Sequence, residues 1–269
     1  MEVQVNIVEF VVPVENNKTV FVWNIEPSQT HADIYCSLHT VFSSFGPLYL
    51  LKVCPLSPAG FYGLVKFYSA SHAADAQRLT DGRSLFQSSP LKVRLSSKQT
   101  PHFMSDGRPL SHARCLELAN HYLGFNGWTS DIITMKELTN EEDEEEGEVR
   151  RRLRFGCLLQ LSFPHHGQTT RGAAVVEHCF TCTEGPDVLI QQRCRLQRLV
   201  TQKALIHAFT SVLLILLADG KVMVELKQTS DQFIPEHTEG VLQVNELNWT
   251  NYPPDDEDDE DEEWDLTVS

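Results

Sequence analysis

Residues 20–25 read Val-Phe-Val-Trp-Asn-Ile, and residues 60–67 read Gly-Phe-Tyr-Gly-Leu-Val-Lys-Phe. Both stretches alternate between two classes of side chain, as a β-strand does when only one of its faces is buried. One face carries small or apolar residues that predict a core, namely Val20, Val22, Gly63, Val65 and Phe67. The other face carries aromatic rings and a cation, namely Phe21, Trp23, Tyr62, Leu64 and Lys66. An exposed sheet face with aromatic rings beside a cation favours stacking of nucleic-acid bases.

The segments around these two strands predict a β-α-β-β-α-β order. Residues 30–45 have a helical apolar stripe that ends at Gly46-Pro47, and residues 69–79 form an alanine-rich second helix. Residues 91–95 predict the fourth strand, in which Lys92 and Arg94 alternate with apolar residues.

These strand sequences, their spacing and the element order resemble the RNA recognition motif (RRM). In that fold the two segments are the adjacent central strands of a four-stranded sheet, and aromatic rings on its open face stack on unpaired bases. The resemblance implies a nucleic-acid site formed by Phe21, Trp23, Tyr62, Leu64, Lys66, Lys92 and Arg94.

Two positions depart from the RRM pattern. Gly60 and Leu64 stand where the family usually has a cation and an aromatic residue. Each base stacked on a ring contributes roughly 1–3 kcal/mol, so the loss of one ring predicts a weaker and less selective site. An RRM that recognises a protein instead is the alternative interpretation.

The charge of the chain is uneven. The net charge is −15, but residues 141–146 with Glu148 supply seven negative charges and residues 255–263 supply nine, so the remainder is close to neutral. Residues 18–98 carry eight Lys or Arg against four Asp or Glu. Blocks of like charge repel themselves and favour disorder, so we expect a disordered acidic loop and a disordered acidic tail.

Two interpretations of the tail remain open. It is either a solvated segment or a competitor that weakens non-specific binding of nucleic acid to the basic face, because the phosphate contribution is electrostatic. Trp264, just beyond the acidic residues, is a candidate anchor for a partner.

Other classes of protein are disfavoured. Seven irregularly spaced cysteines predict a reducing compartment, and the CxxC at 179–182 lacks a second pair of ligands, so we expect no metal and no cofactor. We expect no signal peptide and no membrane span, because no charged and then apolar segment opens the sequence and no apolar run is long enough to cross a bilayer. No phosphate loop, HExxH motif or nucleophile elbow is present, so we expect no enzymatic activity.

The second half of the chain contains a helix, a glycine stop and a strand. Residues 118–128 read Leu-Ala-Asn-His-Tyr-Leu-Gly-Phe-Asn-Gly-Trp and are followed by a predicted strand over 131–138. This segment resembles the Rad-fifty-two family of single-strand-annealing recombination mediators. We expect Gly124 to end the helix in a left-handed backbone conformation, which glycine adopts at little cost. We expect Trp128 to be largely buried.

The resemblance extends over residues 105–227. Residues 150–163 and 169–178 predict an antiparallel hairpin, and residues 189–217 predict one long helix. The annealing proteins carry cations on that helix where this chain has Ile206, His207 and Thr210. The remaining arginines predict a different basic surface or an ordinary solvated face: Arg150, Arg151, Arg152, Arg154, Arg171, Arg193, Arg195 and Arg198.

Together these observations predict an α+β chain with an RRM at 15–97, an annealing-mediator-like domain at 105–227 with an acidic loop at 141–148, and an extension at 228–269 that ends in the acidic tail. This arrangement resembles the vertebrate family of Rad-fifty-two-motif-containing RRM proteins. The resemblance implies binding of single-stranded DNA, double-stranded DNA and RNA, and a role in the response to cisplatin-type DNA damage.

The same resemblance implies a location in the nucleus, nucleoli, other nuclear bodies and cytoplasm. Further candidate partners are a second copy of the chain and nuclear repair or RNA-processing proteins. The alternative function is an adaptor that docks proteins in recombination or RNA-processing complexes.

Overall fold

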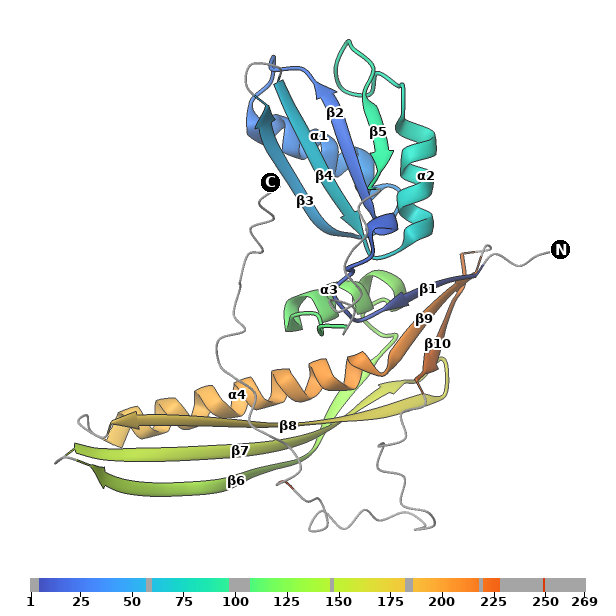
Figure 1. Cartoon of the computed structure of the whole chain (residues 1–269). Coiled ribbons are helices and arrows are strands. Elements are labelled where there is room, and N and C mark those ends of the chain that lie inside the picture. Colours follow the sequence, from blue (N-terminus) through green and yellow to red (C-terminus); the bar gives the residue numbers. More distant parts are fainter. Residues whose placement is uncertain are drawn as a thin grey trace. The chain divides into compact units, whose positions relative to one another are not determined.

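The computed structural model describes residues 5–56, 60–96, 107–145, 148–181, 186–217, 220–227 and 249. The chain divides into two compact units, Met1–Gly124 with Val212–Glu225 and Phe125–Ser211 with Leu226–Ser269. Both units combine helices with β-sheets (Figure 1), so the predicted α+β class is confirmed. Within the described ranges, no helix is long and apolar enough to cross a membrane.

The first unit contains a four-stranded sheet in the order β3-β4-β2-β5, and all neighbouring strands are antiparallel. Its elements follow the order predicted for an RRM: β2 (Thr19–Ile25), α1 (His31–Ser43), β3 (Leu48–Leu56), β4 (Gly60–Phe67), α2 (Ala70–Thr80) and β5 (Lys92–Leu95). The two strands that supply the aromatic residues, β2 and β4, are therefore neighbours at the centre of the sheet.

Both helices pack on the same face of this sheet. Ile34 and Phe42 of α1 and Ala73 of α2 belong to one buried cluster with the strand residues that point toward them. The residues predicted to point inward are all buried: Val20, Val22, Gly63, Val65 and Phe67. The opposite face of the sheet is therefore not covered by α1 or α2.

In the second unit, a long helix lies along a three-stranded antiparallel sheet of order β6-β7-β8 (Figure 1). The elements are β6 (Thr129–Glu145), β7 (Glu148–Phe163), β8 (Gln168–Thr181) and α4 (Pro186–Thr210). Alternate residues of β7 point to the helix side and are buried: Leu153, Phe155, Cys157, Leu159, Leu161 and Phe163. The predicted hairpin is confirmed.

The first unit also contains elements outside the RRM. They are a short 3-10 helix η1 (Asn16–Lys18), the helix α3 (His112–Leu123) and a sheet of order β1-β9-β10, formed by β1 (Val5–Glu9), β9 (Val212–Leu217) and β10 (Val222–Leu226). The division into two units therefore differs from the predicted domain at 105–227. In the structure α3, β9 and most of β10 belong to the first unit. The predicted domain limits remain predictions. Of the extension at 228–269, only Trp249 is described, and the acidic tail and Trp264 lie outside the described residues.

The prediction of one helix over 189–217 is wrong at its C-terminal end, because α4 stops at Thr210 and β9 follows. The Ser211 hydroxyl donates to the carbonyl oxygen of Ala208 and is 2.8 Å from the hydroxyl of Thr170. A continuous apolar run suits either a buried helix or a buried strand. Antiparallel pairing with β1, from the other end of the chain, selects the strand.

The prediction of a disordered acidic loop over 141–148 is wrong for residues 141–145, which extend β6. The register places Glu141 opposite Arg152, Glu142 opposite Arg151 and Asp143 opposite Arg150. Like charges on one strand repel, but opposite charges across an antiparallel pair attract. The arginines of β7 therefore offset the repulsion that would otherwise disfavour a strand here.

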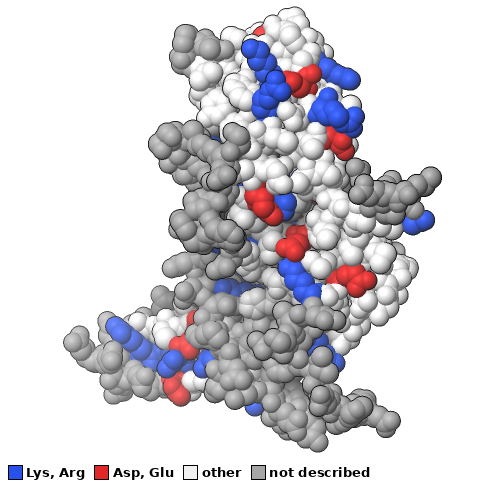
Figure 2. Space-filling view, turned by 45° about the vertical axis from the view of Figure 1, so that its right-hand side comes forward, with Lys and Arg blue, Asp and Glu red and all other residues white. Residues whose placement is uncertain are grey.

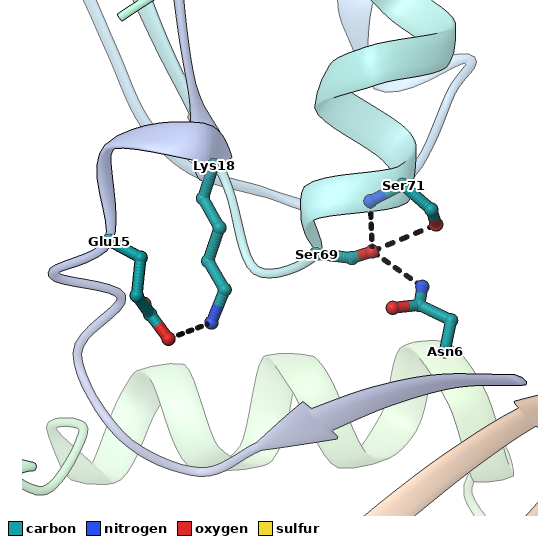
Figure 3. A network of polar contacts seen from close by, with 5 residues as sticks. All are labelled: Asn6, Glu15, Lys18, Ser69 and Ser71. Atoms are coloured by element: carbon teal, nitrogen blue, oxygen red, sulfur yellow. Dashed lines mark hydrogen bonds and ion pairs between the residues drawn. The ribbon is translucent and has the colours of Figure 1, made fainter. Parts of the chain in front are cut away.

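Hydroxyl side chains cap the helices of the first unit. Thr30, Ser69 and Ser111 each accept a hydrogen bond from a backbone N–H in the first turn of α1, α2 and α3. This capping explains why α1 and α2 each begin one residue after the predicted start. Ser69 also accepts a hydrogen bond from the side-chain amide of Asn6 in β1 (Figure 3).

The turn after α3 has the glycine that the sequence predicts. Gly124 ends the helix with a φ of 74°, a left-handed conformation that glycine adopts without steric cost. Trp128 is half-buried and not largely buried as expected, and its ring packs edge-on against Phe209 with centroids 5.5 Å apart. Phe125, in the same turn, is 86% exposed.

Gly172 of β8 allows a close contact between α4 and its sheet. A Cβ atom at this position would lie 2.1 Å from the carbonyl oxygen of Ala204 and 2.4 Å from the backbone nitrogen of Ala208. Backbone atoms cannot rotate away as the end of a side chain can. The absence of a side chain at Gly172 therefore sets the distance between helix and sheet.

We predict that Gly172→Ala lowers the free energy of unfolding by about 1–3 kcal/mol or more, because α4 must move away from the sheet. Chemical denaturation followed by circular dichroism measures the change. Arg171→Ala, at the exposed neighbouring residue, serves as the control and should change stability by less than about 0.5 kcal/mol. Equal stability of the two variants would contradict the close contact.

Candidate nucleic-acid interface

The open face of the RRM sheet carries the residues that the sequence analysis placed there. In β2 and β4 the outward residues alternate with buried ones, and in β5 Lys92 and Arg94 occupy alternate exposed positions. The predicted site residues thus lie on one surface: Phe21, Trp23, Tyr62, Leu64, Lys66, Lys92 and Arg94. Their role in binding remains a prediction.

The strand register arranges part of this surface as a row across the sheet. Phe21 is paired with Leu64 on one side and with Arg94 on the other, and Leu64 is paired with Lys52 of β3. Lys52 is not among the residues predicted from the sequence. The same alternation in β3 would have identified it, because the next residue, Val53, is buried while Lys52 is exposed. The row therefore has a cation at each end.

Two further aromatic residues lie beside this row. Trp23 is 40% exposed, lies opposite Lys92, and has its ring centroid 6.1 Å from that of Phe21, with the planes tilted by 47°. Tyr62 is half-buried and lies opposite Cys54. A hydrogen bond with the Cys54 side chain, followed by burial, raises the pKa of Tyr62. The Tyr62 phenol is therefore neutral near neutral pH.

An irregularity in β2 supports the position of Trp23. The pairing of β2 with β4 shifts between Val22 and Ile25, and Asn24 has a φ of 60°. The side-chain amide of Asn24 donates a hydrogen bond of 2.8 Å to the carbonyl oxygen of Pro90. Bulges of this kind commonly re-aim a neighbouring side chain.

Leu64 occupies the position of the missing aromatic ring. It points to the open face but is only 8% exposed, between its strand neighbours Phe21 and Lys52. A buried aliphatic side chain offers no ring for stacking. As the sequence predicts, this face therefore has one aromatic ring fewer for base stacking than the usual RRM.

The cations of this surface are not equivalent. Lys52 and Lys92 are exposed, whereas Arg94 has its guanidinium 3.5 Å from the carboxylate of Asp81. Lys66 is half-buried, and burial lowers its pKa although the nearby carboxylate of Glu15 opposes this shift. Lys66 is therefore the least suitable of these cations for contacting phosphate.

Glu15 and Lys18 form a local ion pair close to Lys66. The ammonium of Lys18 is 2.9 Å from the carboxylate of Glu15 (Figure 3). Glu15 is exposed, and partial desolvation raises its pKa, but the hydrogen bond from Lys18 and the neighbouring charges outweigh this effect and lower the pKa overall. The carboxylate is thus charged at neutral pH and partly neutralises both lysines.

The eight arginines proposed as a second basic surface are distributed over both sides of the second sheet. Arg152, Arg154 and Arg171 share the side away from α4, while Arg151 points to the other side of β7. Strand alternation also places Arg150 on the side away from α4. The three remaining arginines belong to the helix itself: Arg193, Arg195 and Arg198.

Some of these arginines have acidic partners. Arg152 lies 2.5 Å from the carboxylate of Glu177, and Arg193 lies 3.0 Å from that of Glu137. Figure 2 shows the same mixture over a wider area: among the described side chains in view, Lys and Arg are interspersed with Asp and Glu.

The positions at which the annealing mediators carry cations have local roles in α4. All three are half-buried. His207 has its Nδ1 2.8 Å from the carbonyl oxygen of Ala173, and the Thr210 hydroxyl donates to the carbonyl oxygen of His207. With Ile206 at the third position, this part of α4 offers no row of cations to phosphate.

The described residues contain no group of three or more His, Cys, Asp or Glu side chains able to hold a metal ion. Six cysteines in those residues are free thiols. Cys182, the second cysteine of the CxxC, lies outside the described residues.

Strand order and register define the chain as an RRM protein with a second α+β unit. A model of the RDM1 DSRM domain matches residues 110–213. RAD52 motif-containing protein 1 of Danio rerio is 48% identical over 276 residues, which cover 99% of this chain and 98% of that protein. The protein of the same name from Homo sapiens is 36% identical over 93% of this chain and 92% of its own length.

Among solved structures, the RRM3 structure of Pes4 is 16% identical, covers 32% of this chain and 98% of that chain, and has a TM-score of 0.27. The chain belongs to the RAD52 motif-containing protein 1 family. The resemblance seen in the sequence is confirmed.

Because Val22 and Phe21 point to opposite faces of the sheet, replacing each with alanine should lower the free energy of unfolding by different amounts. Val22→Ala, on the buried side, should lower the free energy of unfolding by about 1.5–3 kcal/mol. Phe21→Ala, on the open side, should cost clearly less, because its ring remains partly exposed after folding. Thermal and chemical denaturation of the two variants measures the difference. A larger loss for Phe21→Ala would contradict the orientation of β2.

Proposed function

We propose that this protein is a non-catalytic nucleic-acid-binding protein whose main contact surface is the open face of the RRM sheet. The observation that carries the proposal is the convergence of Phe21, Trp23 and Tyr62 on a sheet face that α1 and α2 leave uncovered. Lys52 and Lys92 lie beside these rings on the same face. Aromatic faces accept bases and the cations attract phosphates, so the two kinds of side chain complement one strand.

The geometry favours single-stranded nucleic acid. A base can reach these rings only when its own faces are not stacked within a duplex. Bases displaced from a distorted duplex present the same free faces. Single-stranded DNA, RNA and duplex DNA that carries a cisplatin-type lesion are therefore the proposed ligands, and undamaged duplex binds through phosphate contacts alone.

The biological setting is part of the same proposal. The names of the relatives contain the RAD52 motif, and the family resemblance supports a role in the response to DNA damage. With this role we propose a location in the nucleus, including nucleoli and nuclear bodies, as well as in the cytoplasm. Nuclear repair and RNA-processing proteins, and a second copy of the chain, are the proposed protein partners.

We predict that the double variant Phe21→Ala and Tyr62→Ala weakens binding of a single-stranded oligonucleotide by about 2–4 kcal/mol, because two stacking platforms are lost. Fluorescence anisotropy measures the dissociation constant, and circular dichroism checks the fold. Tyr35→Ala, which removes an exposed aromatic side chain from α1, serves as the matched control and should bind normally.

The opposite change gives a second arm to this test. Leu64→Phe restores the missing ring and should tighten binding by up to about 1–3 kcal/mol. Unchanged dissociation constants for both the double variant and Leu64→Phe, with intact folds, would favour the adaptor function over binding through this face. Duplexes with and without a platinum crosslink, compared in the same assay, test the preference for damaged DNA.

A further inference from the structure

Trp249 lies against the face of the second sheet that is opposite α4. A Cβ atom built on Gly156 of β7 would be 2.6 Å from both Cε3 and Cζ3 of the Trp249 indole. Strand alternation places Gly156 on the side of β7 opposite the buried residues that face α4. The indole therefore occupies space that any side chain at position 156 would fill.

The surroundings of Gly156 form an apolar patch on this face. Val175 is paired directly with Gly156, and the next pair along the same face is Leu158 with Ala173. These three side chains are only 1%, 6% and 7% exposed, although α4 covers the other face of the sheet. A flat apolar surface with a glycine at its centre suits an aromatic ring, because the ring can approach the backbone directly.

Cations surround this apolar patch. Lys136 is paired with Gly156 on the side of β6, and Arg154 is two residues away in β7. The described cations of this face are Lys136, Arg150, Arg152, Arg154 and Arg171. Its described acidic residues are fewer: Asp131, Glu141 and Glu177. Among the side chains that the structure describes on this face, cations therefore outnumber acidic groups around an apolar centre.

The acidic run at 255–263 begins six residues after Trp249. Six residues reach at most about 20 Å when extended. Arg152 is four residues from Gly156 along β7, which corresponds to about 13 Å. The tether from an indole bound at Gly156 is therefore long enough for the acidic run to reach the arginines. Such a short tether gives an effective concentration in the millimolar range.

We propose that Trp249 anchors the C-terminal segment on this face and that the acidic run competes there with the phosphates of nucleic acid. The anchoring part stands independently, whereas the competition part rests on the proposed function. Release of Trp249 exposes the apolar patch and removes the acidic run from the surrounding cations at the same time. The second sheet is therefore a regulated phosphate-binding face, distinct from the stacking face of the RRM.

Anchoring is tested without nucleic acid, on the full chain. A fluorescent peptide of residues 244–269 should bind the Trp249→Ala chain at least tenfold more tightly than the wild-type chain, whose site its own Trp249 fills. Trp264→Ala, which removes the other C-terminal tryptophan, is the matched control and should behave as wild type. Adding Gly156→Val to the Trp249→Ala chain should abolish binding of the peptide. Equal binding of the peptide to all chains would overturn the anchor.

Competition is tested with an oligothymidine in a salt series. Trp249→Ala should tighten binding at least tenfold at low salt, and the gain should shrink as salt rises, because screening weakens the acidic competitor. A chain with intact Trp249 but with Asn and Gln in place of the nine acidic residues 255–263 should show a similar gain. Combining Trp249→Ala with the neutralised acidic run should increase the affinity little further, because each change alone already removes the acidic competitor from the face.

The possible results separate the two claims. If the peptide binds as expected but neither variant gains affinity for the oligonucleotide, competition is refuted while the anchor stands. If no variant binds any oligonucleotide, the proposed function fails and the peptide result still decides the anchor. If Trp249→Ala tightens binding while neutralising the acidic residues does not, the indole alone blocks the face and the role of the acidic run is refuted.

Discussion

In the RRM sheet α1 and α2 pack on one face, and in the second sheet α4 packs on one face, so that these helices leave the opposite faces uncovered. This one-sided packing is the constraint on which the candidate sites depend. Because side chains alternate along a strand, burying one face commits every second residue to the other. In β2 the burial of Val20 and Val22 is what directs Phe21 and Trp23 outward. Binding residues are thus positioned by the core behind them.

The two open faces differ in what they offer to a ligand. The RRM face presents rings with cations at the ends of a row, which suits bases and phosphates of one strand. The face of the second sheet has Gly156 at its centre, where the RRM face has Phe21 and Tyr62, and its aromatic group comes from Trp249. A ring supplied by a tethered segment can leave, whereas a ring on the strand itself cannot. The aromatic rings of the RRM face are therefore always in place, whereas the second face is uncovered when Trp249 leaves it.

Much of the RRM was predictable, because period-two alternation, helix stops and strand spacing are local signals. Lys52 was missed although the same alternation in β3 identifies it. The arginines of the second unit were correctly noted as cations, but their division between two sides of a sheet required the register. Trp249 carried no signal in the sequence, since its contact with Gly156 joins residues far apart in the chain.

By itself, the sequence determined the α+β class, the order of the RRM elements, the outward position of the aromatic residues and the family. These follow from patterns within a few residues, where burial and backbone geometry act locally. The tertiary structure decided whether residues 212–217 form a helix or a strand and whether residues 141–145 form a loop or a strand. In both cases the local pattern was ambiguous or unfavourable, and pairing with another strand selected the observed conformation: with β1 from the other end of the chain for 212–217, and with the adjacent strand β7 for 141–145.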